Sequence, residues 1–266
     1  MNAPSPLLRL KDCAAPSVFQ PEKLLREARR QKGLAVDPIP ALGVLDPDGD
    51  IVRHLQAANQ ARPVAGWPCY HSQMVEASIG DQRLGFVGCA VGASYAVLVA
   101  EQFFAAGGQF LISVTSAGQL APKGPTPYFV LIERALRDEG TSHHYQPPAD
   151  YALADPALLA RLAPHLDHLA EPVHRGGVWT TDAPFRETEA AIAAHSGAGL
   201  LAVEMEAAAL YAFAQARQKP VVCFAHVTNR MGEEADDFEK GEAGGARAAL
   251  ALIEAVARAW RAWGGA

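Results

Sequence analysis

Cysteine is scarce in this chain, and the few that occur are far apart. Among 266 residues there are four, and no two of them form a Cys-x-x-Cys pair. They are Cys13, Cys69, Cys89 and Cys223. This usage excludes a disulfide framework and is typical of reduced thiols in a cytoplasmic protein.

Long apolar runs are also missing. No run approaches the ~20 residues that a membrane-spanning helix needs. The first residues, MNAPSPLLRLKD, contain no apolar core of a signal peptide. We therefore expect a cytoplasmic protein that does not associate with a membrane.

Positive charge is in deficit. The chain has 23 Lys and Arg against 29 Asp and Glu, which gives a formal net charge of −6. A nucleic-acid surface needs clustered Lys and Arg to displace phosphate counterions, so this balance argues against a nucleic-acid partner. The basic run from 24 to 33 (LLREARRQKG) is interpreted as the solvated face of a short helix.

Signatures of cofactors and metals are lacking too. Gly85, Gly88 and Gly92 are spaced three and four residues apart, which is not the dinucleotide fingerprint. His143 and His144 have no Cys or His partner at ligand spacing, which favours a hydrogen-bonded loop or a subunit contact. We predict no organic cofactor and no metal.

What the chain does have is a regular alternation of apolar strands and helices. Half of the residues are hydrophobic, which is enough for a large core. Alternation of this kind predicts an α/β fold in which helices cover both faces of a central mixed β-sheet, a three-layer α/β/α sandwich. We predict a single domain over residues 1–266, with residues 1–20 as an N-terminal tail.

Polar loops follow four of the predicted strands. They are Asp46–Asp50, Thr115–Gln119, Thr180–Arg186 and Thr228–Arg230. Because sites in α/β folds gather at the carboxyl ends of strands, we expect these loops to surround a binding site.

One very apolar stretch, GLLAVEMEAAALYAFAQA from 199 to 216, carries two glutamates around a methionine. A buried carboxylate without a partner costs several kcal/mol, roughly, or takes up a proton. Glu204 and Glu206 would avoid this cost if they faced water in the first turn of a helix, where the helix dipole favours acidic side chains. This is one interpretation. The other is a carboxylate that accepts two hydrogen bonds from a diol such as ribose, with Met205 in soft contact with the sugar.

The segment AVEMEAAALYAFA resembles the sugar-binding signature of the nucleoside phosphorylase family, which includes uridine phosphorylase and the hexameric purine nucleoside phosphorylases. Three further segments are similar to that family in order and spacing. They are ALRDEGTSHHY, GVWTTDAPFRET, and HVTNR with the acidic loop after it. The resemblance covers roughly residues 80–266 and is weaker upstream.

The resemblance implies reversible cleavage of the bond between a nucleobase and a pentose. By position, Glu206 would bind the 2′- and 3′-hydroxyls, while Glu204 and Met205 would line the pocket. Phe185 would stack on the base, and Arg186 would reach its edge.

The end of the HVTNR segment bears on the base. Asn229 stands where purine-specific members have an aspartate that protonates the purine. Asn229 and Arg230 together resemble the uridine-type pattern, which favours a pyrimidine or a non-standard base.

The sequence departs from the family where phosphate binds. Ser113 stands where the resemblance implies an arginine, although Ser116 matches the hydroxyl that contacts phosphate and Thr115 lies beside it. In the turn LDPDGD, Gly49 stands where a second arginine is expected. A third arginine comes from a neighbouring subunit in the family, and Arg62 is a candidate for it.

A guanidinium gives phosphate fixed and permanently charged donors, which a serine hydroxyl does not replace. The acidic turn would instead repel a phosphate dianion. Asp46 or Asp48 could orient a water molecule as general base. An ordinary tight surface turn explains the same composition.

Three functions follow. Phosphorolysis to base and pentose 1-phosphate is the family default, with phosphate as co-substrate. Hydrolysis by water is the alternative if the phosphate arginines are absent, and the position of Arg53, Arg62 or Arg83 would discriminate between the two. A non-catalytic nucleoside-binding protein is the third. The resemblance also implies a homodimer or a hexamer.

Overall fold

The computed structural model describes residues 5–9, 11–231 and 240–264, and its centre is a ten-stranded mixed sheet. The strands are β1 (Leu42–Asp46), β2 (Arg62–Pro63), β3 (Val75–Ile79), β4 (Gln82–Gly88), β5 (Phe110–Gln119), β6 (Tyr128–Asp138), β7 (Tyr151–Leu153), β8 (Val173–Thr181), β9 (Leu200–Glu204) and β10 (Val221–Asn229). Their order is β10-β6-β8-β9-β5-β1-β4-β3-β2, and β7 pairs with β6. The hairpin expected around Gly80 and Asp81 is the β3–β4 pair.

Part of the sheet closes on itself. β5 pairs in parallel with β1 and with β10, and its last residues pair antiparallel with β9. β10 continues to β6, β6 to β8 and β8 to β9, so these strands and β5 form a closed ring. The closure brings the carboxyl ends of β5, β9 and β10 together.

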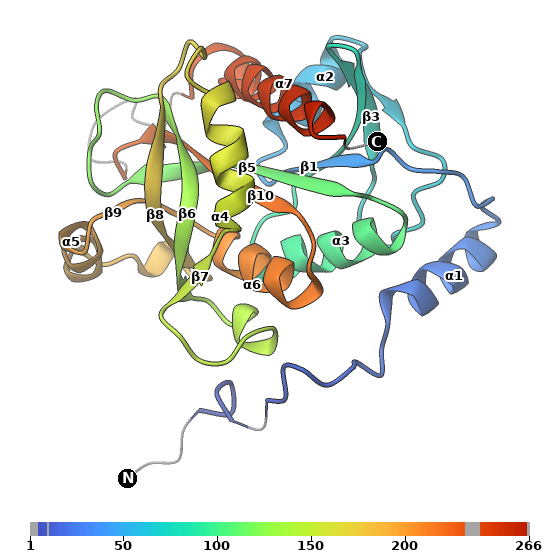
Figure 1. Ribbon diagram of the computed structural model, residues 1–266, viewed down its shortest axis with the longest axis horizontal. Coiled ribbons are helices and arrows are strands. Elements are labelled where there is room, and N and C mark those ends of the chain that lie inside the picture. Colours follow the sequence, from blue (N-terminus) through green and yellow to red (C-terminus); the bar gives the residue numbers. More distant parts are fainter. Residues whose placement is uncertain (1–4, 10, 232–239, 265–266) are drawn as a thin grey trace.

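Helices cover both faces of the sheet, as predicted (Figure 1). On one face lie α2 (Asp50–Ala57), α4 (Pro156–Leu162) and α7 (Ala246–Ala262). On the other lie α3 (Ala93–Ala105) and α6 (Ala207–Arg217), with α1 (Pro21–Lys32) packed outside α3 and α5 (Glu189–Gly197) beside β9. Short 3-10 helices are η1 (Ser142–His144), η2 (Ala163–His165), η3 (Pro184–Arg186) and η4 (Glu242–Gly245). In the described ranges, no helix has both the length and the apolar character to cross a bilayer.

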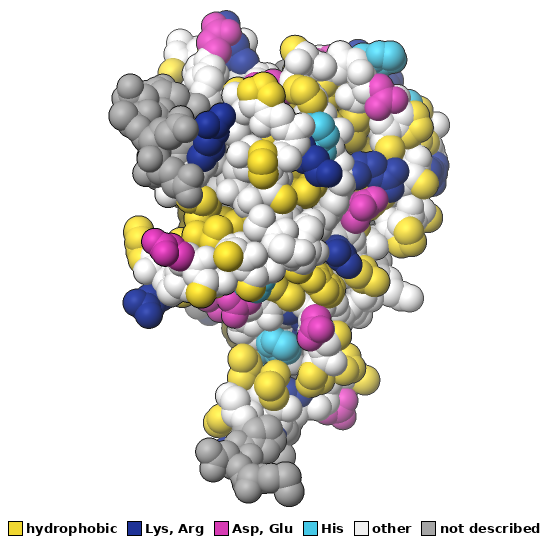
Figure 2. Space-filling model, turned by 90° about the vertical axis from the view of Figure 1, so that its left-hand side faces the viewer, with side chains coloured by type: hydrophobic (Ala, Val, Ile, Leu, Met, Phe, Trp, Pro, Cys, Tyr) yellow, Lys and Arg dark blue, Asp and Glu magenta, His cyan; other side chains and the backbone are white. Residues whose placement is uncertain are grey.

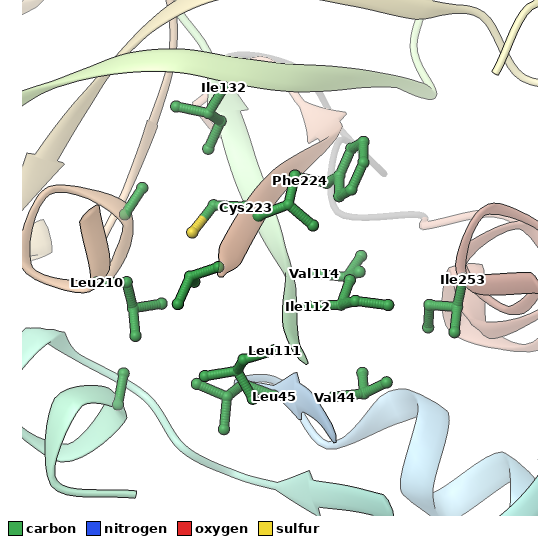
Figure 3. Packing of buried hydrophobic residues seen from close by; sticks show 14 of the residues in the cluster. Val44, Leu45, Leu111, Ile112, Val114, Ile132, Leu210, Cys223, Phe224 and Ile253 are labelled. Carbon is green, nitrogen blue, oxygen red and sulfur yellow. The ribbon is translucent and has the colours of Figure 1, made fainter. Parts of the chain in front are cut away.

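The core follows from the period of the strands, because successive side chains point to opposite faces. Ile112 and Val114 of β5 face Ile253 of α7, whereas Leu111 lies on the side of Leu210 of α6 (Figure 3). Both sets are fully or almost fully buried. A central strand covered on both faces is expected to be mostly apolar, and β5 is apolar from Phe110 to Val114 apart from Ser113.

The described part of residues 1–20 contains no helix or strand, and the tail predicted there stays a prediction. α1 then begins with a proline in its first turn and ends at Gly33, whose left-handed conformation (φ 65°) suits glycine. The single domain over residues 1–266 stays a prediction.

Candidate active site

A cavity of about 340 Å³ opens where the strands of the closed ring end. It is lined by Pro47, Asp48, Val91, Thr115, Ser116, Ala117, Gly118, Pro184, Phe185, Glu187, Val203, Glu204, Met205, Glu206, Asn229 and Met231. Each of the four polar loops predicted to surround a site contributes at least one of these residues. The face with α5 and the ends of β8 and β9 has hydrophobic side chains gathered among scattered charged ones (Figure 2).

Glu204 closes the turn between β9 and α6. Its carboxylate accepts hydrogen bonds from the backbone N–H of Glu206 (2.7 Å) and of Ala207 (2.8 Å), and from the hydroxyl of Thr180. These backbone groups stand at the start of a helix, where N–H donors lack partners within the helix. Glu204 is 4% exposed, so the interpretation as a helix-start acid facing water is wrong.

Glu206 is the residue before α6 and is 1% exposed. Its Oε1 accepts a hydrogen bond from the backbone N–H of Gly92, 2.7 Å away, at the start of α3. Its Oε2 is buried and makes no hydrogen bond of good geometry with the described residues, although the nearby Thr115 hydroxyl works against the rise in the pKa of this carboxyl group. Glu206 also lines the cavity. A free oxygen in this place is available to a ligand hydroxyl.

The two carboxyl groups resist ionisation together. Burial raises the pKa of Glu204 to about 7. Burial, and then the negative charge of Glu204, raise the pKa of Glu206 to about 8. The cavity therefore holds at least one proton near neutral pH, on a pair that can also accept hydrogen bonds.

Asp46 and Asp48, in the acidic segment at the end of β1, have different roles. Asp48 lines the cavity. Asp46 does not line it: its two oxygens accept hydrogen bonds from the N–H groups of Gly49 (3.1 Å) and Val52 (2.9 Å), at the start of α2. Burial raises the pKa of Asp46 to about 6. We therefore assign Asp46 to holding the turn and withdraw it as a general base.

The predicted nucleophile residues come from β5. Thr115 and Ser116 line the cavity. Ser113 lies deeper in the strand, is 1% exposed and does not line the cavity, and its hydroxyl has no hydrogen-bond partner among the described residues. Because Ser113 precedes Thr115 by two residues, it points to the same face one step below the floor.

The predicted base residues are only partly brought together. Phe185 lines the cavity from η3 and is 99% exposed, so its ring stands at the mouth. Asn229 lines the cavity, and its Oδ1 accepts a hydrogen bond from the N–H of Met231 (3.1 Å). Arg186 and Arg230 are not lining residues. The acidic loop after Arg230 lies outside the described residues.

Arg53, Arg62 and Arg83, whose positions were expected to discriminate between phosphorolysis and hydrolysis, do not line the cavity. Arg62 and Arg83 both pair with Glu76, at 2.6 and 3.4 Å. Arg53 pairs with Asp50 at 2.6 Å and donates to the backbone carbonyl of Asp48 at 2.7 Å. Arg53 thus holds the acidic turn from behind.

Sequence reasoning missed several contributors. Gly92 precedes α3, and its N–H reaches Glu206 over 114 residues of chain, which no local signal announces. Thr180 fell within a predicted polar loop without being given a role. Lys240, which pairs with Asp48 and Asp50, gave no signal. Gly118 and Met231 also line the cavity, and a Cβ added at Gly118 would collide with the sulfur of Met231.

The histidines after β6 belong to a hydrogen-bonded loop. His143 Nδ1 lies 3.2 Å from a guanidinium nitrogen of Arg137, and His144 Nδ1 lies 2.8 Å from the ammonium of Lys11. Within the described part of the chain, no group of three or more His, Cys, Asp or Glu side chains could hold a metal ion.

A mixed sheet with paired carboxyl groups in a cavity at its strand ends defines an α/β protein built to bind a small polar ligand. Residues 42–258 match the model of the phosphorylase superfamily, so the chain belongs to that superfamily. This finding confirms the nucleoside phosphorylase family predicted from the signature around Glu206.

The relatives agree with this assignment. The chain is 27% identical over 173 residues to guanosine phosphorylase of Halorubrum lacusprofundi, a match that covers 62% of this chain and 71% of that protein. In fold it is similar to two structures of uridine phosphorylase from Vibrio fischeri ES114, both at a TM-score of 0.69 and 20% identity. The structure complexed with 6-hydroxy-1-naphthoic acid covers 83% of this chain and 90% of its own. The second covers 85% and 95%.

Proposed function

We propose that this protein is a nucleoside phosphorylase that cleaves the N-glycosidic bond and transfers the pentose to phosphate. The free Oε2 of Glu206 carries the proposal, because a buried acceptor without a partner is retained where a ligand supplies the donor. The family match and the guanosine phosphorylase relative support the reaction class.

Each wall of the cavity then has a task. Glu206 accepts the sugar hydroxyls, Met205 contacts the sugar face, and Glu204 fixes the turn that presents them. Phe185 stacks on the base at the mouth. Thr115 and Ser116, on the floor, face the phosphate. Such an arrangement accelerates cleavage by holding the sugar and the nucleophile in line and by stabilising charge as it develops.

Asn229 points to the kind of base. Its side-chain oxygen accepts a hydrogen bond from the N–H of Met231, which leaves the NH₂ group of this cavity-lining residue available as a donor. An NH₂ donor suits an exocyclic carbonyl, which uracil and the 6-oxopurines both present. We propose a nucleoside whose base carries such a carbonyl. Uridine, a pyrimidine nucleoside, therefore stays a candidate substrate, and guanosine becomes one.

The function is tested by incubating the pure protein with uridine, guanosine, inosine, cytidine and adenosine, with and without phosphate. The sugar product is then identified by mass. Pentose 1-phosphate that forms only with phosphate is the expected result. Free pentose formed without phosphate would make the protein a hydrolase, and tight binding without turnover would make it a nucleoside-binding protein.

The carboxyl pair predicts a pH dependence. With a pKa of about 8, Glu206 is mostly protonated at pH 6, and a protonated carboxyl group accepts fewer hydrogen bonds than a carboxylate. We expect kcat/KM for the nucleoside to rise by about 10- to 50-fold between pH 6 and pH 8, as the carboxylate form of Glu206 becomes populated. Initial rates at saturating phosphate check this. A flat or falling profile would contradict the assignment of Glu206 as an acceptor of two hydroxyl groups.

We also propose a cytoplasmic homo-oligomer, a homodimer or a hexamer. The exposed Val91 and Phe185 support a partner copy at the mouth, since both are apolar and both line the cavity. Analytical ultracentrifugation measures the state directly.

A further inference from the structure

The Asp48 carboxylate sits on the floor of the cavity as a bound anion would. Its Oδ2 accepts a hydrogen bond from the backbone N–H of Ser116 at 2.8 Å, and its Oδ1 accepts one from the Ser116 hydroxyl at 2.9 Å. The ammonium of Lys240 lies 3.3 Å from the same Oδ1. A backbone N–H, a hydroxyl and an ammonium thus converge on one carboxylate, a donor set that suits any oxyanion of similar size.

Lys240 is held in place independently of Asp48. Its Nζ lies 2.8 Å from Asp50 Oδ2, and the other oxygen of Asp50 is bound by Arg53. The Lys240 side chain is 25% exposed, and it lines a small space of about 20 Å³ behind the cavity floor. If the Asp48 side chain turns away, Asp50 still fixes the ammonium near Ser116.

Asp48 has the freedom to turn. Its side chain is 30% exposed and borders both the main cavity and the small space behind it. Its backbone is fixed, because Arg53 donates to its carbonyl oxygen at 2.7 Å. A rotation of this one side chain would therefore free the Ser116 donors without moving the turn.

The charges around Asp48 mean that a phosphate could bind here only if the Asp48 carboxylate moved away. Two cations, Lys240 and Arg53, stand against the carboxyl groups of Asp46, Asp48 and Asp50. A phosphate dianion placed beside an undisturbed Asp48 would meet a like charge and occupied donors. Of the described residues, no arginine lines the cavity to offset this.

We propose that Lys240 determines the nucleophile of this enzyme: with Ser116 it binds the phosphate oxyanion, and Asp48 occupies these donors in the free protein until phosphate displaces it. This inference rests on the proposed phosphorolysis. It gives the chain a cation where Ser113 and Gly49 stand in place of the arginines that the family resemblance implies. No bond forms or breaks in the exchange, in which one anion replaces another on the same donors.

The test compares Lys240→Met, Lys240→Arg and Asp48→Asn with Lys219→Met as matched control. Lys219 is exposed and precedes the amino end of β10, at the opposite end of that strand from the cavity. Calorimetry measures inorganic phosphate binding to each free protein, and initial rates give separate KM values for phosphate and nucleoside.

Lys240→Met is expected to weaken phosphate binding and raise the phosphate KM by about 10- to 100-fold, since it removes a charge-assisted contact. Its nucleoside KM should change less than about twofold, and Lys240→Arg should keep most of the phosphate affinity. Asp48→Asn should lower the phosphate KM severalfold, because the competing charge is gone. Lys219→Met should match the wild type.

Unchanged phosphate binding in Lys240→Met would overturn the proposal, as would a wild type that binds no phosphate. Lost turnover in Asp48→Asn with unchanged phosphate affinity would also overturn it, since Asp48 would then act as a base. If Lys240→Met does not fold, Asp48→Asn and Lys240→Arg decide alone. Failure of the proposed function is a separate result: the wild type binds phosphate but releases no base from any nucleoside.

Discussion

Glu206→Gln is expected to abolish nearly all nucleoside cleavage while making the protein more stable at pH 8. The variant keeps an oxygen for the N–H of Gly92 and keeps the shape of the side chain. It replaces the buried Oε2, which we assign to the sugar, by an NH₂ group. A site built around one hydrogen-bonding pattern rejects its mismatch by a factor on the order of 10²–10⁴, and we expect a loss of that size in kcat/KM.

The gain in stability follows from the raised pKa of Glu206. Its folded pKa of about 8 lies well above the ordinary value of 4.5 for a glutamate, so the folded protein holds a proton that the unfolded chain releases. The free energy of unfolding therefore falls as pH rises from about 5 to about 8. Glutamine carries no such proton, so Glu206→Gln should be the more stable protein at pH 8, by on the order of 1–3 kcal/mol.

Urea unfolding at pH 5.5 and pH 8, followed by circular dichroism, measures both effects beside the activity assay. Glu189→Gln is the matched control, because Glu189 is exposed in the first turn of α5. It should leave both the activity and the pH slope unchanged. Full activity in Glu206→Gln would remove Glu206 from the sugar site, and an unchanged slope would remove it as the source of the pH dependence.

Much of the fold was predictable because it is encoded locally. The apolar residues of β10 up to Ala225 and of β5 up to Val114, apart from Ser113, predict both strands, since a strand covered on both faces is mostly apolar. The tight turn at Gly80 and Asp81 likewise announces the β3–β4 hairpin. The closure of the ring through the β5–β10 and β5–β9 pairs was not predictable, because strand pairing over long separations leaves no local pattern.

The site residues, too, were predictable where a local sequence signature contains them and not predictable elsewhere. Glu204, Met205 and Glu206 stand in one short signature, and the structure places all three at the cavity. The carboxylates of Asp46 and Asp48 look alike in the sequence, yet one caps α2 and the other faces the cavity. Period alone could not separate them, because Asp46 is the last residue of β1 and Asp48 lies in the turn after it, where the alternation of strand faces no longer holds.

Distant partners were the least predictable part. Gly92 and Lys240 meet Glu206 and Asp48 only after the chain has folded, across 114 and 192 residues. Nothing in the residues around Lys240 distinguishes it from a surface lysine. From the sequence, the acidic turn was expected to repel phosphate, because Lys240, the lysine that pairs with it, lies far along the chain.

Glu204→Ala is expected to damage the fold far more than any change to Glu206. The Glu204 carboxylate is the shared acceptor for the N–H groups of Glu206 and Ala207 and for the Thr180 hydroxyl. Removing it leaves these donors buried, and each unsatisfied donor costs about 1–3 kcal/mol. Water entering the small space left behind would recover a part, so we expect the free energy of unfolding to fall by about 3–5 kcal/mol.

The comparison with Glu187→Ala isolates that effect. Glu187 lines the same cavity, but none of the described residues donates a hydrogen bond to its carboxylate, and burial raises its pKa as well. Its removal should cost less than about 1 kcal/mol, since no donor is orphaned. Urea unfolding of both variants at pH 7 gives the difference. Equal stabilities would mean that the β9–α6 turn is held by packing, and that Glu204, like Glu206, is placed in the cavity for its ligand.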